Sequence, residues 1–487
     1  MTDTNFAKLT QRLFDQQNNA RRVDSWIYSE ALGFDIPRKA KAEHRALAEL
    51  SRTPWLGLVV TTAAQALRVG DITSNGERVE GLYRLWVDNG LKSQQMAFYR
   101  AVLAYGNAFT VTTLGVDGRA KIRFVSPTRC AVIYNDPADI NPAQAIEVAP
   151  RKGDRARYWL YSPGITQLVE EDNSDPDGRG YVVLEEFETR LDVVPVVEAC
   201  NQRTLDGQVI GEVTPLIPTA QRINKSAYDR LLMQHFNSWR VRYATGIDLP
   251  REQVNTPEIQ AYGVGAESSP APALPSVDPL DPMGRKKPPL NAEEVEKVKL
   301  RLAQDDFLIS DSPETSFGTL EASSMDDIIS AFKTDVESLA AVSQTPAHAL
   351  VGSMINVSGD ALAEARAPLT QKISERQEMI GDAFVRTLKI AAGLMGDNVT
   401  VEDPYLTISW RDMEIRSLSQ AADALGKASQ MLEIPARGLW GRIPGTDAAE
   451  LQKWEKLHEE EAQNDPLAAL ARRQTTPISE PQFKAVS

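Results

Sequence analysis

Cysteine and histidine are scarce in this chain: two cysteines and four histidines occur among 487 residues. Cys130 and Cys200 stand far apart and form no CxxC pair. Their spacing argues against a zinc site or a disulfide framework and favours reduced thiols in a cytoplasm. No histidine has a second one at metal-ligand spacing, so we expect neither a metal nor a cofactor. The isolated histidines are His44, His235, His348 and His458.

Long apolar runs are also missing. No segment approaches the roughly 20 apolar residues that a membrane span requires. The first residues, Met1 to Asn5, lack the basic region and apolar run of a signal peptide. We therefore expect a protein that is made and folded in a cytoplasm, with no membrane contact.

Motifs for nucleotide chemistry fail at required positions. Gly426-Lys427 is the nearest match to a phosphate-binding loop, but Ala421 replaces its first glycine and Ala428 replaces its magnesium-binding Ser or Thr. No nucleophile elbow, zinc-protease motif or dinucleotide fingerprint occurs. We predict no catalytic residues, and therefore not an enzyme.

The composition is that of a folded chain, with 42% hydrophobic and 25% charged residues. Its length predicts two or three substructures. The formal net charge of -14 does not suit a surface that grips phosphates. It suits a protein that stays soluble, or one that lets nucleic acid pass without sticking.

Periodicity predicts an α+β, mainly α, chain. Apolar residues at helical spacing dominate residues 1 to about 112, whereas residues 108–200 alternate as an antiparallel sheet with a turn at Asp117-Gly118. A long helix follows, with Pro215 and Pro218 near its start, where a helix tolerates proline. The predicted strands cover residues 108–114, 121–125, 131–134, 157–161, 181–188 and 193–197.

A proline-rich excursion spans residues 240–310, and such a long irregular segment favours a functional projection. Two readings stay open for its basic triplet, Arg285, Lys286 and Lys287: phosphate contact or a solvated loop. Arg240 and Arg242 alternate on a candidate strand, and they suit acids of a neighbouring subunit as well as nucleic acid.

After the excursion, a stripe from Met325 to Ala340 predicts an amphipathic helix that ends before Pro346. Small and polar residues then form a predicted loop, and a second apolar stripe predicts a helix from Gly359 onward. Pro368 lies inside that helix and predicts a bend. A strand at 406–410, helices at 416–431 and 447–461, and a mobile tail from Ala462 complete the prediction.

The order of these parts resembles the portal proteins of tailed bacteriophages, in the branch typical of long-tailed phages. The resemblance is carried by residues 326–350, by Val357 to Leu362 and by Trp410-Arg411-Asp412, with further likeness at 421–425 and 434–440. It covers most of residues 5–460 in order of elements and is specific mainly from about 307 to 445.

The resemblance implies a portal-type fold with a wing, two stem helices, a clip and a helical crown. The implied parts are a wing of helices and antiparallel strands at 1–213, a first stem helix at 214–239, a clip at 240–310, a strand, turn and second stem helix at 311–345, a tunnel loop at 346–358, a bent helix and wing strand at 359–415, a crown at 416–461 and a tail at 462–487.

The same resemblance implies a homo-oligomeric ring, usually of about twelve copies, at one capsid vertex of the virion, assembled in the host cytoplasm. Double-stranded DNA would pass through it. Its implied partners are the large terminase subunit, a head-completion or adaptor protein, and the major capsid and scaffolding proteins. The clip would dock partners through Arg240, Arg242 and the triplet, and the tunnel loop would face DNA through His348, Gly352, Ser353, Asn356 and Ser358.

Two functions other than that of a portal are alternatives for this sequence. One is a cytosolic enzyme whose active site follows no motif, but the sequence offers no convergent group of titratable residues. The other is a different ring-forming head-tail adaptor, although completion proteins are usually much shorter than this chain.

Overall fold

The structure is a computed structural model, and it describes residues 4–36, 41–151, 153, 155–172, 180–189, 191–238, 242–245, 316–319, 325–352, 359–411, 418–443, 446 and 448–464. The chain divides into two units. The first comprises residues 1–226 with 331–487, and the second comprises residues 227–330.

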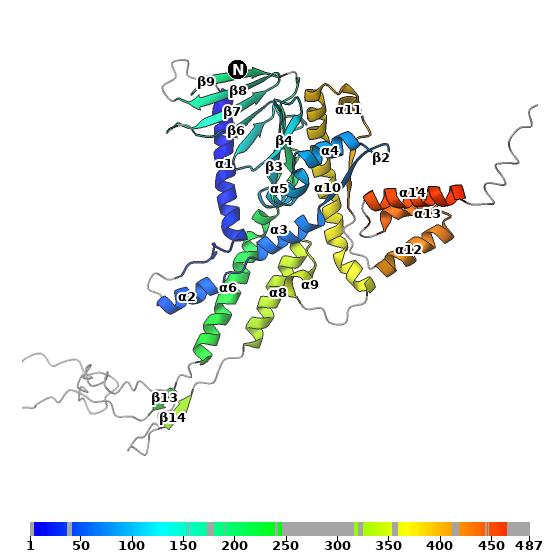
Figure 1. Ribbon diagram of the computed structural model, residues 1–487. Coiled ribbons are helices and arrows are strands. Elements are labelled where there is room, and N and C mark those ends of the chain that lie inside the picture. The colour runs from blue at the N-terminus through cyan, green and yellow to red at the C-terminus, as the bar shows by residue number, and fades with distance from the viewer. Residues whose placement is uncertain are drawn as a thin grey trace, which may run out of the picture. The chain divides into compact units, whose positions relative to one another are not determined.

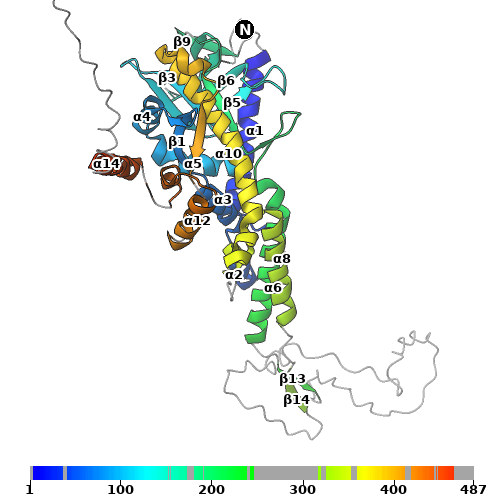
Figure 2. The same cartoon turned by 90° about the vertical axis from the view of Figure 1, so that its right-hand side faces the viewer.

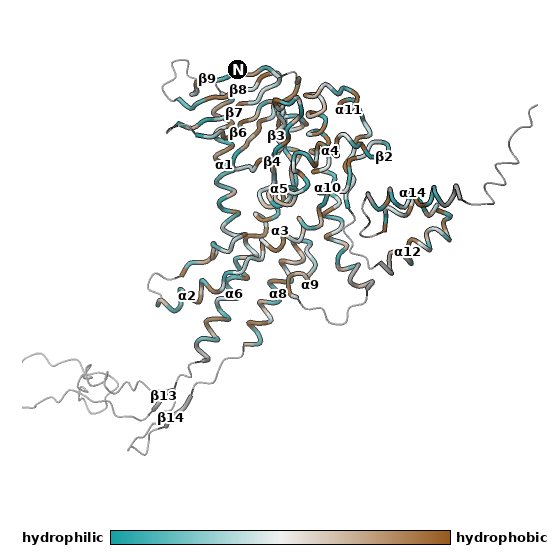
Figure 3. The backbone as a smooth tube through the Cα atoms, in the orientation of Figure 1, coloured by the Kyte–Doolittle hydropathy of each residue, from teal (hydrophilic) through white to brown (hydrophobic). Residues whose placement is uncertain are grey.

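Helices dominate the beginning of the first unit, as the sequence predicts (Figure 1). Apolar residues recur on one side of the first helix, and Figure 3 shows brown and teal mixed along it. The helices are α1 (Thr4–Ile27), α2 (Ala42–Leu50), α3 (Trp55–Ala66), α4 (Glu80–Asp88) and α5 (Leu91–Tyr105).

The sequence did not predict a small sheet within this helical region. Strand β1 (Val69–Ser74) pairs antiparallel with β2 (Glu77–Arg78) and with β15 (Thr407–Trp410), so the order is β15-β1-β2. The predicted strand at 406–410 is therefore confirmed, and its partner comes from the other end of the chain.

Residues 107–200 form two sheets, so the prediction of a single antiparallel sheet was wrong. The three-stranded sheet has the order β10-β3-β4, with β3 (Asn107–Leu114), β4 (Ala120–Val125) and β10 (Val196–Cys200). The turn between β3 and β4 is confirmed, and Gly118 takes the positive φ of 72° that favours glycine. Strand β10 begins after Pro195, because proline cannot donate to a strand ladder.

The second sheet has five antiparallel strands in sequence order. Its strands β6 and β8 were not predicted, because both mix polar with apolar residues without strict alternation. The strands are β5 (Cys130–Ile133), β6 (Gln144–Val148), β7 (Arg157–Ser162), β8 (Ile165–Glu171) and β9 (Tyr181–Glu188). A further pair, β11 (Gln202–Arg203) with β12 (Val209–Ile210), leads to the next helix.

The long helices follow the predicted order, and they are α6 (Val213–Ser238), α8 (Asp326–Val342) and α10 (Gly359–Met395). Two short helices also occur here, α9 (Ala347–Val351) and α11 (Asn398–Glu402). The second unit contains the end of α6, the beginning of α8 and a hairpin of β13 (Arg242–Thr245) with β14 (Ser316–Thr319). The remaining helices are α12 (Leu418–Met431), α13 (Ala436–Leu439), η1 (Trp440–Arg442) and α14 (Ala448–Asn464).

The main core of the first unit forms around the C-terminal half of α10. Phe384 is 1% exposed, and its ring centroid lies 5.0 Å from that of Trp86 and 5.4 Å from that of Phe98. Close by, the hydroxyls of Thr110 and Thr387 share a hydrogen bond of 2.6 Å. These contacts fix α10 against α4, α5 and β3. Among the helices that the structure describes, none is both long and apolar enough to span a membrane.

Candidate functional site

The two predicted stem helices, α6 and α8, lie side by side where both belong to the first unit (Figures 1 and 2). Asp335 on α8 joins them: its carboxylate accepts a hydrogen bond of 2.9 Å from the Ser226 hydroxyl and lies 3.5 Å from the Arg222 guanidinium. Arg222 is exposed, so its ion pair contributes only about 0–1 kcal/mol. The contact fixes the relative register of the two helices more than it stabilises them.

The apolar stripe predicted on α8 is buried in its second half only. Val336, Leu339 and Ala340 are buried, whereas Ile329, in the second unit, is 36% exposed. The opposite face is polar and open to solvent, with Lys333 and Glu337 exposed. Acidic residues in the first turn favour the positive end of the helix dipole.

The predicted tunnel loop begins as ordered structure. Residues 347–351 form the single turn of α9, which is anchored by the buried Leu350 and ends at Gly352 with a left-handed φ of 70°. His348 is half-buried on this helix, so the irregular segment expected from residue 346 starts later than predicted. Ser353, Asn356 and Ser358 lie outside the described residues.

A buried ionic junction connects α10 to both stem helices. Lys372 and Arg376 are each 3% exposed on α10, and both bind Glu212, which directly precedes α6. The Lys372 ammonium lies 3.2 Å from the Glu212 carboxylate, and Arg376 donates to that carboxylate at 3.0 Å and 3.3 Å. Lys372 also donates a hydrogen bond of 2.8 Å to the Ser343 carbonyl, just beyond the end of α8.

The charges of this junction complement the helix ends that they touch. The last carbonyls of a helix have no partner inside the helix, and a cation at that end also favours its dipole. Lys372 meets both requirements at the end of α8. Glu212 supplies an anion at the beginning of α6, where the dipole favours negative charge. Each buried charge thus has a partner, and Lys372 and Glu212 also meet a favourable helix end.

Electrostatics keep the Glu212 carboxyl ionised. Burial alone would raise the pKa of Glu212, but the charges of Lys372 and Arg376 and their hydrogen bonds outweigh burial and lower that pKa. Burial lowers the pKa of the Lys372 ammonium, and the Glu212 charge offsets only part of that effect. The junction therefore depends on the anion, because Glu212 is the carboxylate that both buried cations contact.

Sequence reasoning missed this junction. Lys372 and Arg376 stand four residues apart beside Ile373 and Ile380, both 0% exposed, on the apolar stripe of α10. A charged pair at helical spacing on a buried stripe was the available signal.

The side chains that the structure describes at the beginning of α10 are all exposed. Residues 364–368 are all exposed, and burial begins with the half-buried Leu369. The helix continues through Pro368, which removes one backbone hydrogen bond. The bend at Pro368 stays a prediction.

The predicted clip residues are placed only in part. The backbone of Arg242 belongs to β13 and pairs in register with Thr319 of β14. Arg240 and the basic triplet 285–287 lie outside the described residues, as does the tail from residue 465 onward.

Two carboxylates, those of Glu147 and Glu198, are buried in the sheet region. Glu147 accepts two hydrogen bonds from Arg123, at 2.9 Å and 3.0 Å, and one of 2.8 Å from Tyr161. Glu198 accepts hydrogen bonds from Asn107 at 2.6 Å and from Tyr134 at 2.9 Å. All four carboxylate oxygens are thus engaged by protein donors, which is how a protein stabilises buried acids.

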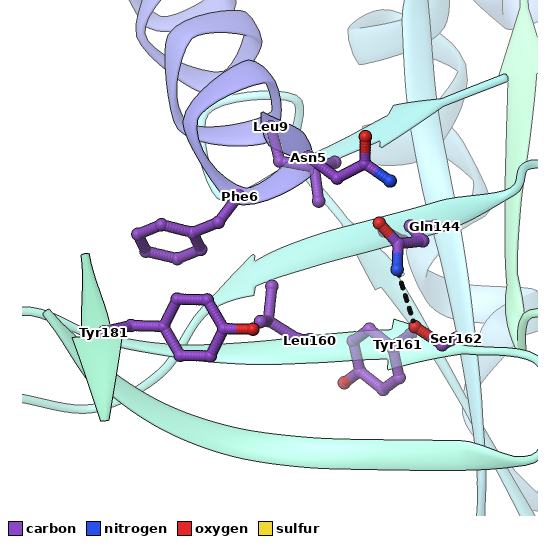
Figure 4. A pocket seen from close by; sticks show the side chains of 9 residues that line it. Asn5, Phe6, Leu9, Gln144, Leu160, Tyr161, Ser162 and Tyr181 are labelled. Atoms are coloured by element: carbon purple, nitrogen blue, oxygen red, sulfur yellow. Dashed lines mark hydrogen bonds between the residues drawn. The ribbon is translucent and has the colours of Figure 1, made fainter. Parts of the chain in front are cut away.

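A small pocket lies between the beginning of α1 and the five-stranded sheet (Figure 4). Phe6, Leu160 and Tyr181 line it, and Gln144 donates a hydrogen bond of 3.1 Å to Ser162 at its rim. No carboxylate, histidine or cysteine lines this pocket. Within the described ranges, no three His, Cys, Asp or Glu residues are arranged to hold a metal ion.

The first unit thus joins α6, α8 and α10 through a buried ionic junction to a body of helices and antiparallel sheets. The chain belongs to the phage portal protein family, SPP1 Gp6-like, whose family model matches residues 8–464. Proteins of this portal family are structural rather than enzymatic.

Two solved structures are similar to this chain. One is a chain of the "Virion of native gene transfer agent (GTA) particle", with 13% identity and a TM-score of 0.43, covering 85% of this chain and 99% of that one. The other belongs to the "Neck of native GTA particle computed with C12 symmetry", with 10% identity and a TM-score of 0.42, covering 88% of this chain and 100% of that one. No curated protein matches the chain.

Proposed function

We propose that this portal protein forms a closed ring at one vertex of a phage capsid, and that the viral DNA passes through the centre of the ring. The observation that carries the proposal is the family match over residues 8–464. The ring contains about twelve copies, in keeping with closed cyclic symmetry. It assembles in the host cytoplasm and remains in the virion.

The junction on α10 supports a mechanical role for the stem helices. DNA moving through a ring pushes on the wall, and the wall helices must transmit that load to the body. Glu212, Lys372 and the Ser343 carbonyl connect the beginning of α6, the end of α8 and α10 at distances of 2.8–3.2 Å. The site is built to hold the helices at one position relative to the body.

The chemistry of the wall suits passage. Each phosphate contact adds affinity and slows movement, so a conduit avoids a dense basic lining. The exposed charged residues of α8 are three acids and one lysine, and the formal charge of the chain is -14. The segment after α9 acts as the tunnel loop, with Gly352, Ser353, Asn356 and Ser358 offering weak polar contacts to DNA.

Partner proteins supply the energy for packaging and close the channel afterwards. The clip, residues 240–310, docks the large terminase subunit during packaging and a head-completion or adaptor protein afterwards, through Arg240, Arg242 and the triplet Arg285, Lys286 and Lys287. The wing contacts the major capsid and scaffolding proteins, and the crown faces the capsid interior.

Deleting Gly352 to Val357 tests the role of the tunnel loop. We expect the variant to form rings, since α9 and α10 keep their anchors, but to package or retain less DNA than the wild type. Replacing the same residues by a Gly-Ser segment of equal length is the matched control for chain length. Loss of the ring in the deletion variant would show that the loop is structural, which contradicts the proposal for this segment.

A further inference from the structure

The five-stranded sheet ends in an open edge at β9. Among the described residues, β9 pairs only with β8, and it is the outermost strand of the sheet in Figure 1. An edge strand presents a row of backbone N–H and C=O groups that can pair with another extended chain.

The face of the sheet beside this edge is only partly covered. On one face, α1 packs against the sheet through Phe6, Leu9 and Leu13. On the other face, the residues of β3 and β10 cover the inner strands, where Tyr161 is buried, but Trp159 toward the edge is only half-buried.

Apolar side chains continue from there to the edge. Trp159 is opposite Leu168 in the register, and the Trp159 ring lies 6.1 Å from that of Phe187. Phe187 is 48% exposed and Val182 is 43% exposed. Since β-strand residues alternate between faces, Trp159, Leu168, Phe187 and Val182 share one face, with Glu185 among them opposite Leu168.

The charges of the edge have one sign. Glu185, Glu186 and Glu188 are exposed on β9, and the strand contains no lysine or arginine. Glu186 accepts a hydrogen bond of 2.6 Å from Gln167. Glu186 and Glu188 share the face of β9 opposite Phe187, and neither makes an ion pair within the part of the chain that the structure describes.

We propose that β9 is a docking edge for an extended protein segment in which basic and apolar residues alternate. The segment pairs with the backbone of β9 as an added strand, its apolar residues cover Phe187 and Val182, and its basic residues neutralise Glu186 and Glu188 on the other face. Strand addition of this kind takes affinity from main-chain hydrogen bonds and specificity from alternate side chains.

The same charges argue against a second copy of the chain as the occupant. Two β9 strands would place glutamates opposite glutamates, and like charges directly across a strand pair are destabilising. A basic segment meets no such repulsion.

A peptide of alternating Lys and Val, as long as the eight-residue β9, is the probe. Its binding to the full chain is measured by fluorescence anisotropy, and protection of the amides of 181–188 by hydrogen exchange. We expect saturable binding with protection of these amides. Changing Glu186→Lys with Glu188→Lys should weaken it about tenfold or more, because two attractive pairs become repulsive.

The matched control is Glu459→Lys with Glu460→Lys on α14, which makes the same charge change on exposed residues elsewhere. We expect it to bind the peptide as the wild type does. Phe187→Thr keeps the charges and removes apolar contact, and we expect about tenfold weaker binding. A Lys-Ser peptide should likewise bind weakly.

Equal weakening in the α14 variant would mean generic charge attraction and would overturn the proposal. So would binding without protection of 181–188, or tighter binding by a peptide with the β9 sequence, which would identify a second copy as the occupant. None of these outcomes bears on ring formation, so the two proposals fail separately.

Discussion

Changing Glu212 to Gln would remove the only carboxylate that both Lys372 and Arg376 contact among the described residues. The side chains of these cations are 2% and 3% exposed, and that of Glu212 is 12% exposed. Removing one partner from a buried ion pair costs about 3–5 kcal/mol, because the remaining charge stays desolvated. We expect a loss of stability near the upper value, about 5 kcal/mol, since two cations lose their anion together.

Two variants should lose less stability than Glu212→Gln. Lys372→Met leaves Glu212 paired with Arg376 and removes the donor to the Ser343 carbonyl, which costs about 1–3 kcal/mol for an unsatisfied buried group. Glu375→Gln makes the same chemical change as Glu212→Gln on another partner of Arg376, 3.4 Å away and 57% exposed. An exposed pair contributes about 0–1 kcal/mol, so this control should change little.

Native-state hydrogen exchange is the assay, read at the amides of the beginning of α6 and the end of α8. It reports local opening free energies without assuming that a chain of two units unfolds in one step. We expect the loss to decrease in the order Glu212→Gln, Lys372→Met, Glu375→Gln. A loss from Glu212→Gln no larger than that from Glu375→Gln would refute the junction as a stabilising element.

The pH dependence has a defined sign. The folded-state pKa of Glu212 is lowered, so its contribution to stability is present above the unfolded value of about 4.3 and is lost as pH falls through the folded pKa. The difference between wild type and Glu212→Gln should be full near neutral pH and shrink below about pH 4.

Three further outcomes follow from the described residues. Leu339→Ala, at a side chain 0% exposed, should lower the free energy of unfolding by about 2–5 kcal/mol, measured by denaturant midpoint. Gly106→Ala should destabilise far more than Gly118→Ala, because a Cβ at Gly106 meets the Gly211 nitrogen at 2.9 Å whereas the space at Gly118 is open; the two melting temperatures compare them. Burial raises the pKa of the Cys130 and Cys200 thiols, so a thiol reagent should label them only after denaturation, and rapid labelling of the native chain would contradict their burial.

Local patterns predicted the elements that depend on neighbouring residues. The stripe of α8 and the turn at Gly118 are properties of a few adjacent residues, and both were placed correctly. The phage portal family was also identified from residue segments and is confirmed by the family match.

Long-range pairing was not predictable from the same patterns. Strand β1 pairs with β15 through Ile72 and Ile408, and no local signal joins residues so far apart. Lys372 reads as a solvated charge until Glu212, 160 positions away, is placed against it. Whether a charged side chain is buried depends on its partner, and only the fold brings that partner close.

Imaging the purified full chain tests the central proposal most directly, with mass photometry of the same sample. Twelve copies of 53.7 kDa predict a particle of about 640 kDa with a central hole, as closed cyclic symmetry requires. The account predicts such rings. A chain that stays a 53.7 kDa monomer at high concentration, also after scaffolding protein is added, would contradict it.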